Sequence, residues 1–261
     1  MPVNCCIYMK NNKLIQVFAV VAVGLFSVAC HHDATQDKGD ALTSFPYPES
    51  KYWAHGVNTV ELGREKAPLF GGLEVDINYS AWQDQLFVGH DLEDTINGLT
   101  FDMWLDSLPQ PVTNCLWLDT KSLAYDNASR TAHLILEAVR RHGIADRVMV
   151  ENWDRYALHV VKDSGLHVIL WVDNPWWSGI SEEEFRIKTQ QQIDFLHPDA
   201  ISGDYHNFPR LSDSFPDQNI HIWDTPRNCN DTNVGHSRMI AGNASVRVVL
   251  VDYPFPPDMI D

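Results

Sequence analysis

The run Leu73-Glu-Val-Asp-Ile77 alternates apolar and acidic residues over five positions, and this alternation decides the fold class. Successive side chains of a β-strand point to opposite faces, so the three apolar residues share one face and Glu74 and Asp76 share the other. In a sheet covered by helices, the apolar face meets the helix layer. Both carboxylates would then point into the space that a barrel encloses.

Short apolar runs recur along the rest of the chain, with gaps long enough for helices. The predicted strands are Tyr52–Ala54, Leu73–Ile77, Leu116–Asp119, Val148–Glu151, Val168–Val172, Ala200–Ser202, Ile220–Trp223 and Val246–Val251. Helical periodicity marks Ser129–His142 and Asp154–Ser164 between them. Strands and helices in alternation indicate a parallel sheet.

Eight such strands favour a closed sheet over an open one, because closure leaves no unpaired edge. The sequence therefore predicts a single (β/α)8 barrel, the TIM-barrel architecture, over residues 51–261. An open, doubly wound sheet is the alternative. Polar stretches at 205–219 and 225–244 are expected to be long loops at the barrel mouth.

The composition bounds the partners of this 261-residue chain. Its formal net charge of −16 argues against nucleic acid as a partner, because phosphate backbones are bound by broad basic surfaces. A cation and a few local bases can still make an acidic protein bind a small anionic ester. We expect a monomer.

Residues 1–29 resemble a lipoprotein signal peptide. Lys10 and Lys13 precede an apolar run that ends in Val28-Ala29-Cys30, and the run is too short for a comfortable membrane span. We expect lipidation of Cys30 and a flexible tether over residues 30–50, with cleavage of an ordinary signal peptide as the alternative. The protein would then be an exported lipoprotein of a bacterial cell envelope, held by its lipid on the periplasmic or surface side of a membrane. Cys115 and Cys229 are expected at opposite ends of the barrel and hence unpaired.

Polar residues follow almost every predicted strand, at the end where barrels carry their functional groups. Glu74 and Asp76 repel each other unless a cation lies between them, and Asp119 ends the next strand. Hard divalent ions take oxygen ligands, so the three acids predict a metal site, with Mg²⁺ favoured over Ca²⁺. Lys121 alternates with Asp119 and offers a charge to a phosphate oxygen.

Two histidines could supply acid–base chemistry beside this metal site. His55 follows the first strand, and His90 stands in Val88-Gly-His-Asp91. An imidazole pair can act as general base and general acid when one starts neutral and the other protonated. A metal and a lysine can stabilise charge on the phosphoryl oxygens.

Four ordered motifs resemble the glycerophosphodiester phosphodiesterase-like superfamily of phospholipase-C-like barrels. They are His-x-x-Asn, Glu-Val-Asp, Gly-His-Asp and Leu-Asp-x-Lys, at 55–58, 74–76, 89–91 and 118–121. The resemblance extends over about residues 52–257. Gly56-Val-Asn58 replaces the usual Arg-Gly after the first histidine, which is closer to the sphingomyelinase D and menorin-like branches.

The resemblance implies a role for each matched residue. His55 and His90 would be the acid–base pair, and Glu74, Asp76 and Asp119 would hold the metal. Substrate would contact Lys121, Trp223, Asn58 and Glu151. The substrate would be a small phosphodiester or a phospholipid head group.

Two readings of the barrel and two of its tryptophans stay open at this point. The barrel could be a non-catalytic binding lipoprotein or a glycoside hydrolase, although paired acids in glycosidases are spaced across a substrate bond rather than side by side. Trp171, Trp176 and Trp177 could form an aromatic lip for a lipid or a sugar, or they could cover the barrel end.

Overall fold

The computed structural model describes residues 44–91 and 98–260. The predicted signal peptide, Cys30 and the tether up to residue 43 lie outside the described residues. The described residues form one compact unit, and nine strands are assigned among them. Within the described ranges no helix combines the length and the hydropathy that a membrane span needs.

Eight parallel strands close into a barrel, which confirms the predicted architecture. They are β1 (Tyr52–Ala54), β2 (Gly72–Ser80), β4 (Cys115–Thr120), β5 (Val148–Asn152), β6 (His167–Trp171), β7 (Ala200–Asp204), β8 (Ile220–Trp223) and β9 (Val246–Val251). The sheet runs β1-β9-β8-β7-β6-β5-β4-β2, and β1 also pairs with β2. That last pairing closes the barrel and excludes the open sheet.

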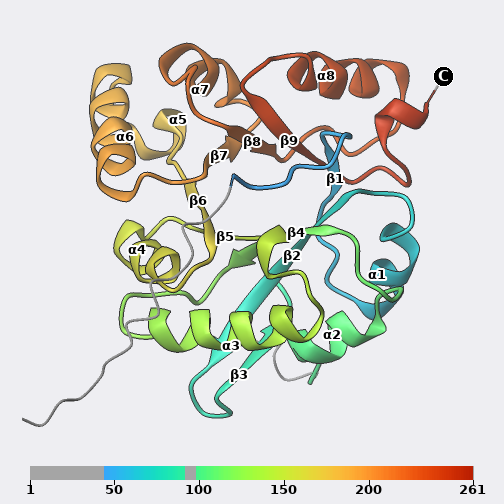
Figure 1. Ribbon diagram of the computed structural model, residues 1–261. Helices are drawn as coiled ribbons and strands as arrows, with labels where there is room; N and C mark the ends of the chain where they lie inside the picture. The colour runs from blue at the N-terminus through green and yellow to red at the C-terminus, as the bar shows by residue number, and fades with distance from the viewer. Residues whose placement is uncertain (1–43, 92–97, 261) are drawn as a thin grey trace, which may run out of the picture. The chain divides into compact units, whose positions relative to one another are not determined.

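Helices surround the strands (Figure 1). Their bounds are α1 (Val60–Lys66), α2 (Phe101–Ser107), α3 (Ala128–Arg141), α4 (Arg155–Asp163), α5 (Pro175–Ser178), α6 (Glu182–Leu196), α7 (Phe208–Ser214) and α8 (Asp231–Ala241), with 3-10 turns η2 (Ala145–Arg147) and η3 (Pro257–Met259). The two helices expected from periodicity are α3 and α4, each within one residue at either end. The Asp154 side chain caps α4 by accepting from the N–H groups of Tyr156 and Ala157.

Both stretches expected to be loops contain a helix instead. Helix α7 lies within 205–219 and α8 within 225–244. Each buries few residues, such as Leu211 in α7 and Ile240 in α8. With so few apolar positions the helical periodicity was too weak to detect in the sequence.

A short antiparallel strand, β3 (Gln85–Val88), was also not predicted. It pairs with the outer half of β2, with Ile77 opposite Val88 and Ser80 opposite Gln85. Strand β2 is therefore longer than expected and continues beyond the barrel. This hairpin leads the chain to His90.

The strands separate two apolar clusters. Leu73, Val75 and Ile77 belong to the outer cluster against the helices, as the alternation predicted. The inner cluster fills the barrel and includes Trp53 and Trp117. Gly72 is required beside Trp53, because a Cβ there would lie 2.0 Å from the indole ring.

Residues 44–50 close the end of the barrel at which the strands begin. Phe45 is buried with its ring centroid 5.2 Å from that of His167, and the Tyr47 hydroxyl shares a 3.0 Å hydrogen bond with His221 Nε2. Among the described residues before 51, Phe45 and Tyr47 thus already pack on the barrel, because their rings cover the open end of the inner cluster. Cys115 and Cys229 are free thiols, as expected.

Candidate active site

A cavity of about 590 Å³ opens at the end of the barrel where the strands finish. Its lining contains nearly all of the predicted site residues. These are His55, Asn58, Glu74, Asp76, His90, Asp119, Lys121, Glu151 and Trp223, joined by Gly56, Trp117, Asn152, Trp153, Trp171, Asp224, Arg227 and Leu250. The barrel thus gathers predicted site residues that are up to 168 positions apart in sequence (55 to 223) into one cavity.

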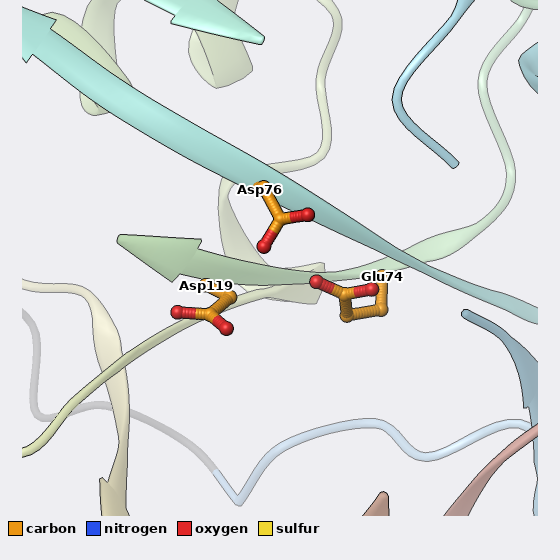
Figure 2. Close-up of side chains that lie close together, drawn as sticks. All are labelled: Glu74, Asp76 and Asp119. Carbon is orange, nitrogen blue, oxygen red and sulfur yellow. The ribbon is translucent and has the colours of Figure 1, made fainter. Parts of the chain in front are cut away.

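Three carboxylates meet on one side of this cavity (Figure 2). Glu74 and Asp76 point inward from β2, and Asp119 points inward from the register position opposite Asp76 on β4. One oxygen of each carboxylate lies within 4.8 Å of the others. The two β2 acids are buried, at 2% and 6% exposure. Their donor chemistry fits a hard divalent cation.

Fixed donors hold these carboxylates in place. Gly56, whose φ of +64° favours glycine, donates its N–H to Glu74 Oε2 over 2.6 Å. Asn58 donates from Nδ2 to Asp76 Oδ2 and accepts at Oδ1 from the N–H of Asp76. Both polar atoms of Asn58 face Asp76, so the geometry favours a positioning role over the expected substrate contact.

Lys121 is the cation nearest to the triad. Its Nζ lies 2.9 Å from Asp76 Oδ1 and also donates to Asp119 Oδ2. Burial alone would lower the pKa of this ammonium, but the two carboxylates raise it, so Lys121 stays charged. A phosphate oxygen bound beside Asp119 would find this charge already in position.

The electrostatics of the triad indicate a need for positive charge. Burial raises the pKa of Glu74 to about 8, and the charge of Asp76 adds to the effect. Burial also raises the pKa of Asp119 against the opposing charge of Lys121. Three ionised carboxylates at this spacing are costly without a further cation, and a divalent ion would reverse both shifts.

His55 is held by the carboxylate of Asp252, an acid expected at the barrel mouth from its place after the last strand but without a predicted role of its own. Its Nδ1 lies 3.0 Å from Asp252 Oδ1, and its Nε2 lies 3.8 Å from Glu74 Oε2. Burial by itself would lower the pKa of His55, but the hydrogen bond to Asp252 and the charge of Glu74 raise it to about 9. Asp252 therefore orients the ring, with Nε2 on the side of the triad.

Register explains why His55 and Asp252 meet. Ala54 of β1 pairs with Val251 of β9, so the next residue of each strand leaves the barrel at the same point. Arg227 adds a second partner, with Nε 3.1 Å from Asp252 Oδ2. Barrel closure pairs the first strand with the last, and applying this pairing to the sequence would have predicted the contact between His55 and Asp252.

His90 lies on the outer side of the cavity. Its side chain is 65% exposed, and Nδ1 lies 2.9 Å from Asp91 Oδ1. Asp91 thus orients this ring as Asp252 orients the other. The two predicted imidazoles line one cavity but differ in exposure, since only His55 is packed between two elements of the barrel.

Glu151 belongs to the cavity wall. It is 5% exposed, accepts from Trp117 Nε1 over 2.9 Å and accepts from the Ser202 hydroxyl. Burial, reinforced by the charge of Asp119, raises its pKa well above the usual carboxyl range. Both oxygens are occupied within the protein, so Glu151 supports Trp117 and narrows the cavity near Asp119.

Tryptophans form the wall across the barrel from the triad. Trp171 ends β6 and Trp223 ends β8, and their ring centroids are 6.3 Å apart in an edge-to-face arrangement. Trp223 is followed by Asp224, which lines the cavity with a φ of +57° that side chains rarely adopt. The cavity is therefore acidic on one side and aromatic on the other.

Comparison with known proteins supports the fold. Neither a protein-family model nor a curated protein matches the sequence. Among solved structures, a phosphodiesterase from Oleispira antarctica in complex with the product sn-glycerol-3-phosphate matches with a TM-score of 0.61 at 14% identity, over 82% of this chain and 95% of that one. A glycerophosphodiester phosphodiesterase from Parabacteroides distasonis matches with a TM-score of 0.60 at 15% identity, over 80% and 95%. At these identities the likeness establishes a shared barrel fold.

Proposed function

We propose that this chain is a metal-dependent phosphodiester hydrolase of the glycerophosphodiester phosphodiesterase-like superfamily. The main support is that Glu74, Asp76 and Asp119 lie close together in one cavity, with Lys121 and His55 beside them. The four sequence motifs and the shared fold with phosphodiesterases support the same reaction class. Gly56-Val-Asn58 further supports a place near the sphingomyelinase D and menorin-like branches.

Glu74, Asp76 and Asp119 would hold the cation, with Mg²⁺ the better match than Ca²⁺ for a site with few protein ligands. A bound divalent ion supplies positive charge to the phosphoryl oxygens of the substrate. Gly56 and Asn58 keep the ligand oxygens aimed at one point, and Lys121 contributes a second positive charge on the Asp119 side.

The two histidines would move the protons. One imidazole takes the proton of the attacking oxygen, from water or from a hydroxyl of the substrate itself. The P–O bond to the leaving group then breaks, and the other imidazole returns a proton to the leaving oxygen. His55 is oriented for this exchange by Asp252, and His90 by Asp91.

The substrate we propose is a phosphodiester derived from a phospholipid, or a phospholipid head group. Trp171 and Trp223 offer flat apolar walls to the part of the substrate beyond the phosphate. We also propose that the protein is an exported lipoprotein of a bacterial cell envelope, attached to the membrane through lipid on Cys30. The sequence of residues 10–30 supports this location.

The proposal is tested by hydrolysis of bis(4-nitrophenyl) phosphate by residues 39–261, with Mg²⁺, with Ca²⁺ and with a chelator. We expect turnover that needs the metal and falls by about a hundredfold or more in His55→Ala and in His90→Ala. His159→Ala is the matched control, because His159 is an exposed histidine on α4 paired with Asp163. Its activity should equal that of the parent chain.

Two outcomes would contradict the proposal. Turnover that survives both His55→Ala and His90→Ala would exclude the acid–base pair. Binding of the diester with no turnover under any metal would indicate a barrel that binds without catalysis.

A further inference from the structure

Helix α5, which follows β6, presents two tryptophans to solvent. Trp176 is 75% exposed and Trp177 is 57% exposed, while Pro175 before them is buried. The side chain of Asn174 caps the helix by accepting from the N–H of Trp176. Both rings are thus held outward by a capped turn. Neither ring is buried, and of the two readings left open by the sequence this exposure favours an aromatic lip.

The neighbouring loop extends this exposed aromatic surface. Trp153 follows β5, the strand next to β6, and is 61% exposed while also lining the cavity. We call Trp153, Trp176 and Trp177 the tryptophan rim. So much exposed indole area beside a cavity is unfavourable in water unless a partner covers it.

The tryptophan rim is continuous with the aromatic wall of the cavity. The ring centroid of Trp177 lies 6.4 Å from that of Trp223, which in turn contacts Trp171. An apolar surface therefore runs from the solvent-exposed helix to the inside of the cavity. A partner bound to the tryptophan rim therefore lies directly beside the cavity entrance.

The charges beside the rim identify the kind of partner. The three acids that begin α6 are paired, Glu182 with Arg210, Glu183 with Arg186 and Glu184 with Lys188. Together with the net charge of −16, these ion pairs leave little positive charge beside α5 to attract anionic lipids, with Arg155 contributing one such charge near Trp153. Tryptophan prefers the interface between lipid head groups and acyl chains, where its ring is buried and its N–H stays hydrated.

We propose that the tryptophan rim docks the mouth of the barrel onto the surface of a zwitterionic phospholipid bilayer. The docked rim places the cavity entrance among lipid head groups. This inference rests on the proposed function for its purpose, because a lipid-derived diester has to reach the cavity. Binding of the rim to the bilayer depends only on the exposed tryptophan rings and does not require catalysis.

The test is binding of residues 39–261 to phosphatidylcholine vesicles, measured by co-sedimentation and by the blue shift of tryptophan fluorescence. We expect the partition coefficient to fall roughly tenfold in Trp176→Ala and further in the Trp176→Ala/Trp177→Ala double variant. Trp82→Ala is the matched control, because Trp82 is 95% exposed on the turn between β2 and β3, outside the cavity lining. Its vesicle binding should match that of the parent chain.

Salt and folding controls sharpen the result. Binding by ring insertion should change little between low and high salt, unlike binding by charge. Trp176→Phe keeps an aromatic ring on α5 and should recover most of the binding if the alanine effect comes from lost insertion. Circular dichroism of each variant shows that the barrel is folded.

Several outcomes overturn the inference. They are equal binding by all variants, absence of binding by the parent chain, and a dimer in solution that Trp176→Ala dissociates without any effect on vesicles. The vesicle measurement needs no turnover. Rim-dependent binding without hydrolysis would therefore support this inference while contradicting the proposed function.

Discussion

The two ends of the barrel interior are built by the same strands but differ in chemistry. Where the strands begin, Phe45 and Tyr47 close the barrel over Trp53 and Trp117, and the interior is mainly apolar and aromatic, with His167 and His221 buried among the rings. Where they finish, carboxylates and imidazoles line an open cavity. Strand β4 shows the change within five positions, from buried Cys115 to the half-exposed Asp119. One end contributes stability, and the other concentrates charge at a cost in stability.

Two histidines show the same difference in a single residue type. Burial at the closed end lowers the pKa of His221 to about 3, because its neighbours there are aromatic rings and the Tyr47 hydroxyl. At the mouth, the hydrogen bond to Asp252 and the charge of Glu74 outweigh burial and raise the pKa of His55 to about 9. The direction of the shift is decided by available carboxylates rather than by burial alone.

The largest expected effect is on chemistry at the mouth. Glu74→Gln removes one of the three proposed metal ligands and should lower kcat/KM by about a hundredfold to a thousandfold. The same change removes one of three repelling carboxylates, so the metal-free protein should melt at a higher temperature. Kinetics and thermal unfolding measure the two effects. Glu137→Gln, on the exposed face of α3, is the control and should change neither kcat/KM nor the melting temperature. Normal activity in Glu74→Gln would contradict a role of the three acids in catalysis.

At the closed end the expected effect is on stability. Trp53→Ala empties the space that Gly72 leaves for the indole, and it should lower the free energy of unfolding by about 3–5 kcal/mol. Urea denaturation measures the change. Trp53→Phe keeps most of the volume and removes a buried N–H that has no partner among the described residues. A loss in Trp53→Ala no larger than in Trp53→Phe would show that the closed end is not tightly packed.

Stability should depend on pH in opposite senses at the two ends. Glu74 and His55 both bind protons more tightly in the folded state than in the unfolded state, so they favour folding at low pH. This stabilisation is lost as the pH rises, from about 4.5 to 8 for Glu74 and from about 6.5 to 9 for His55. His221 is neutral when folded, so its contribution is lost as pH falls from 6.5 towards 3. Melting temperatures of the metal-free protein should therefore fall between pH 7 and 9, and Mg²⁺ should reduce that fall. A profile that Mg²⁺ leaves unchanged would contradict a cation at Glu74.

The smallest expected effect concerns the segment that closes the barrel. Tyr47→Phe removes the hydrogen bond to His221 and should cost about 1 kcal/mol of unfolding free energy, without an effect on kcat/KM. Tyr79→Phe is a control at an exposed hydroxyl that bonds Asp84. A tenfold loss of activity in Tyr47→Phe would show that the two ends are coupled and would break the comparison.

The sequence predicted a helix or strand correctly where its buried and exposed faces carry clearly different residues. The alternation in β2 and the long apolar face of α3 were readable because the two faces of each element meet different surroundings. For β2 these are the helix layer and the cavity, and for α3 the core and solvent. Strand β3 and helices α7 and α8 were missed because their few buried residues carry too little periodicity. Each of these three elements packs on strands next to it in the chain, β3 on β2, α7 on β7 and β8, and α8 on β9.

The sequence alone determined the barrel, the three inward acids and the motif histidines, since each follows from local periodicity or from the place of a residue at a strand end. Only the tertiary structure decided which side chains meet. In the folded chain His55 contacts Asp252 because the first and last strands pair, and Asn58 bonds Asp76. Phe45 packs over one end of the barrel, and Trp176 and Trp177 stay exposed. These outcomes depend on contacts between distant segments, whose partners are set by strand register and packing and are not encoded in any local pattern.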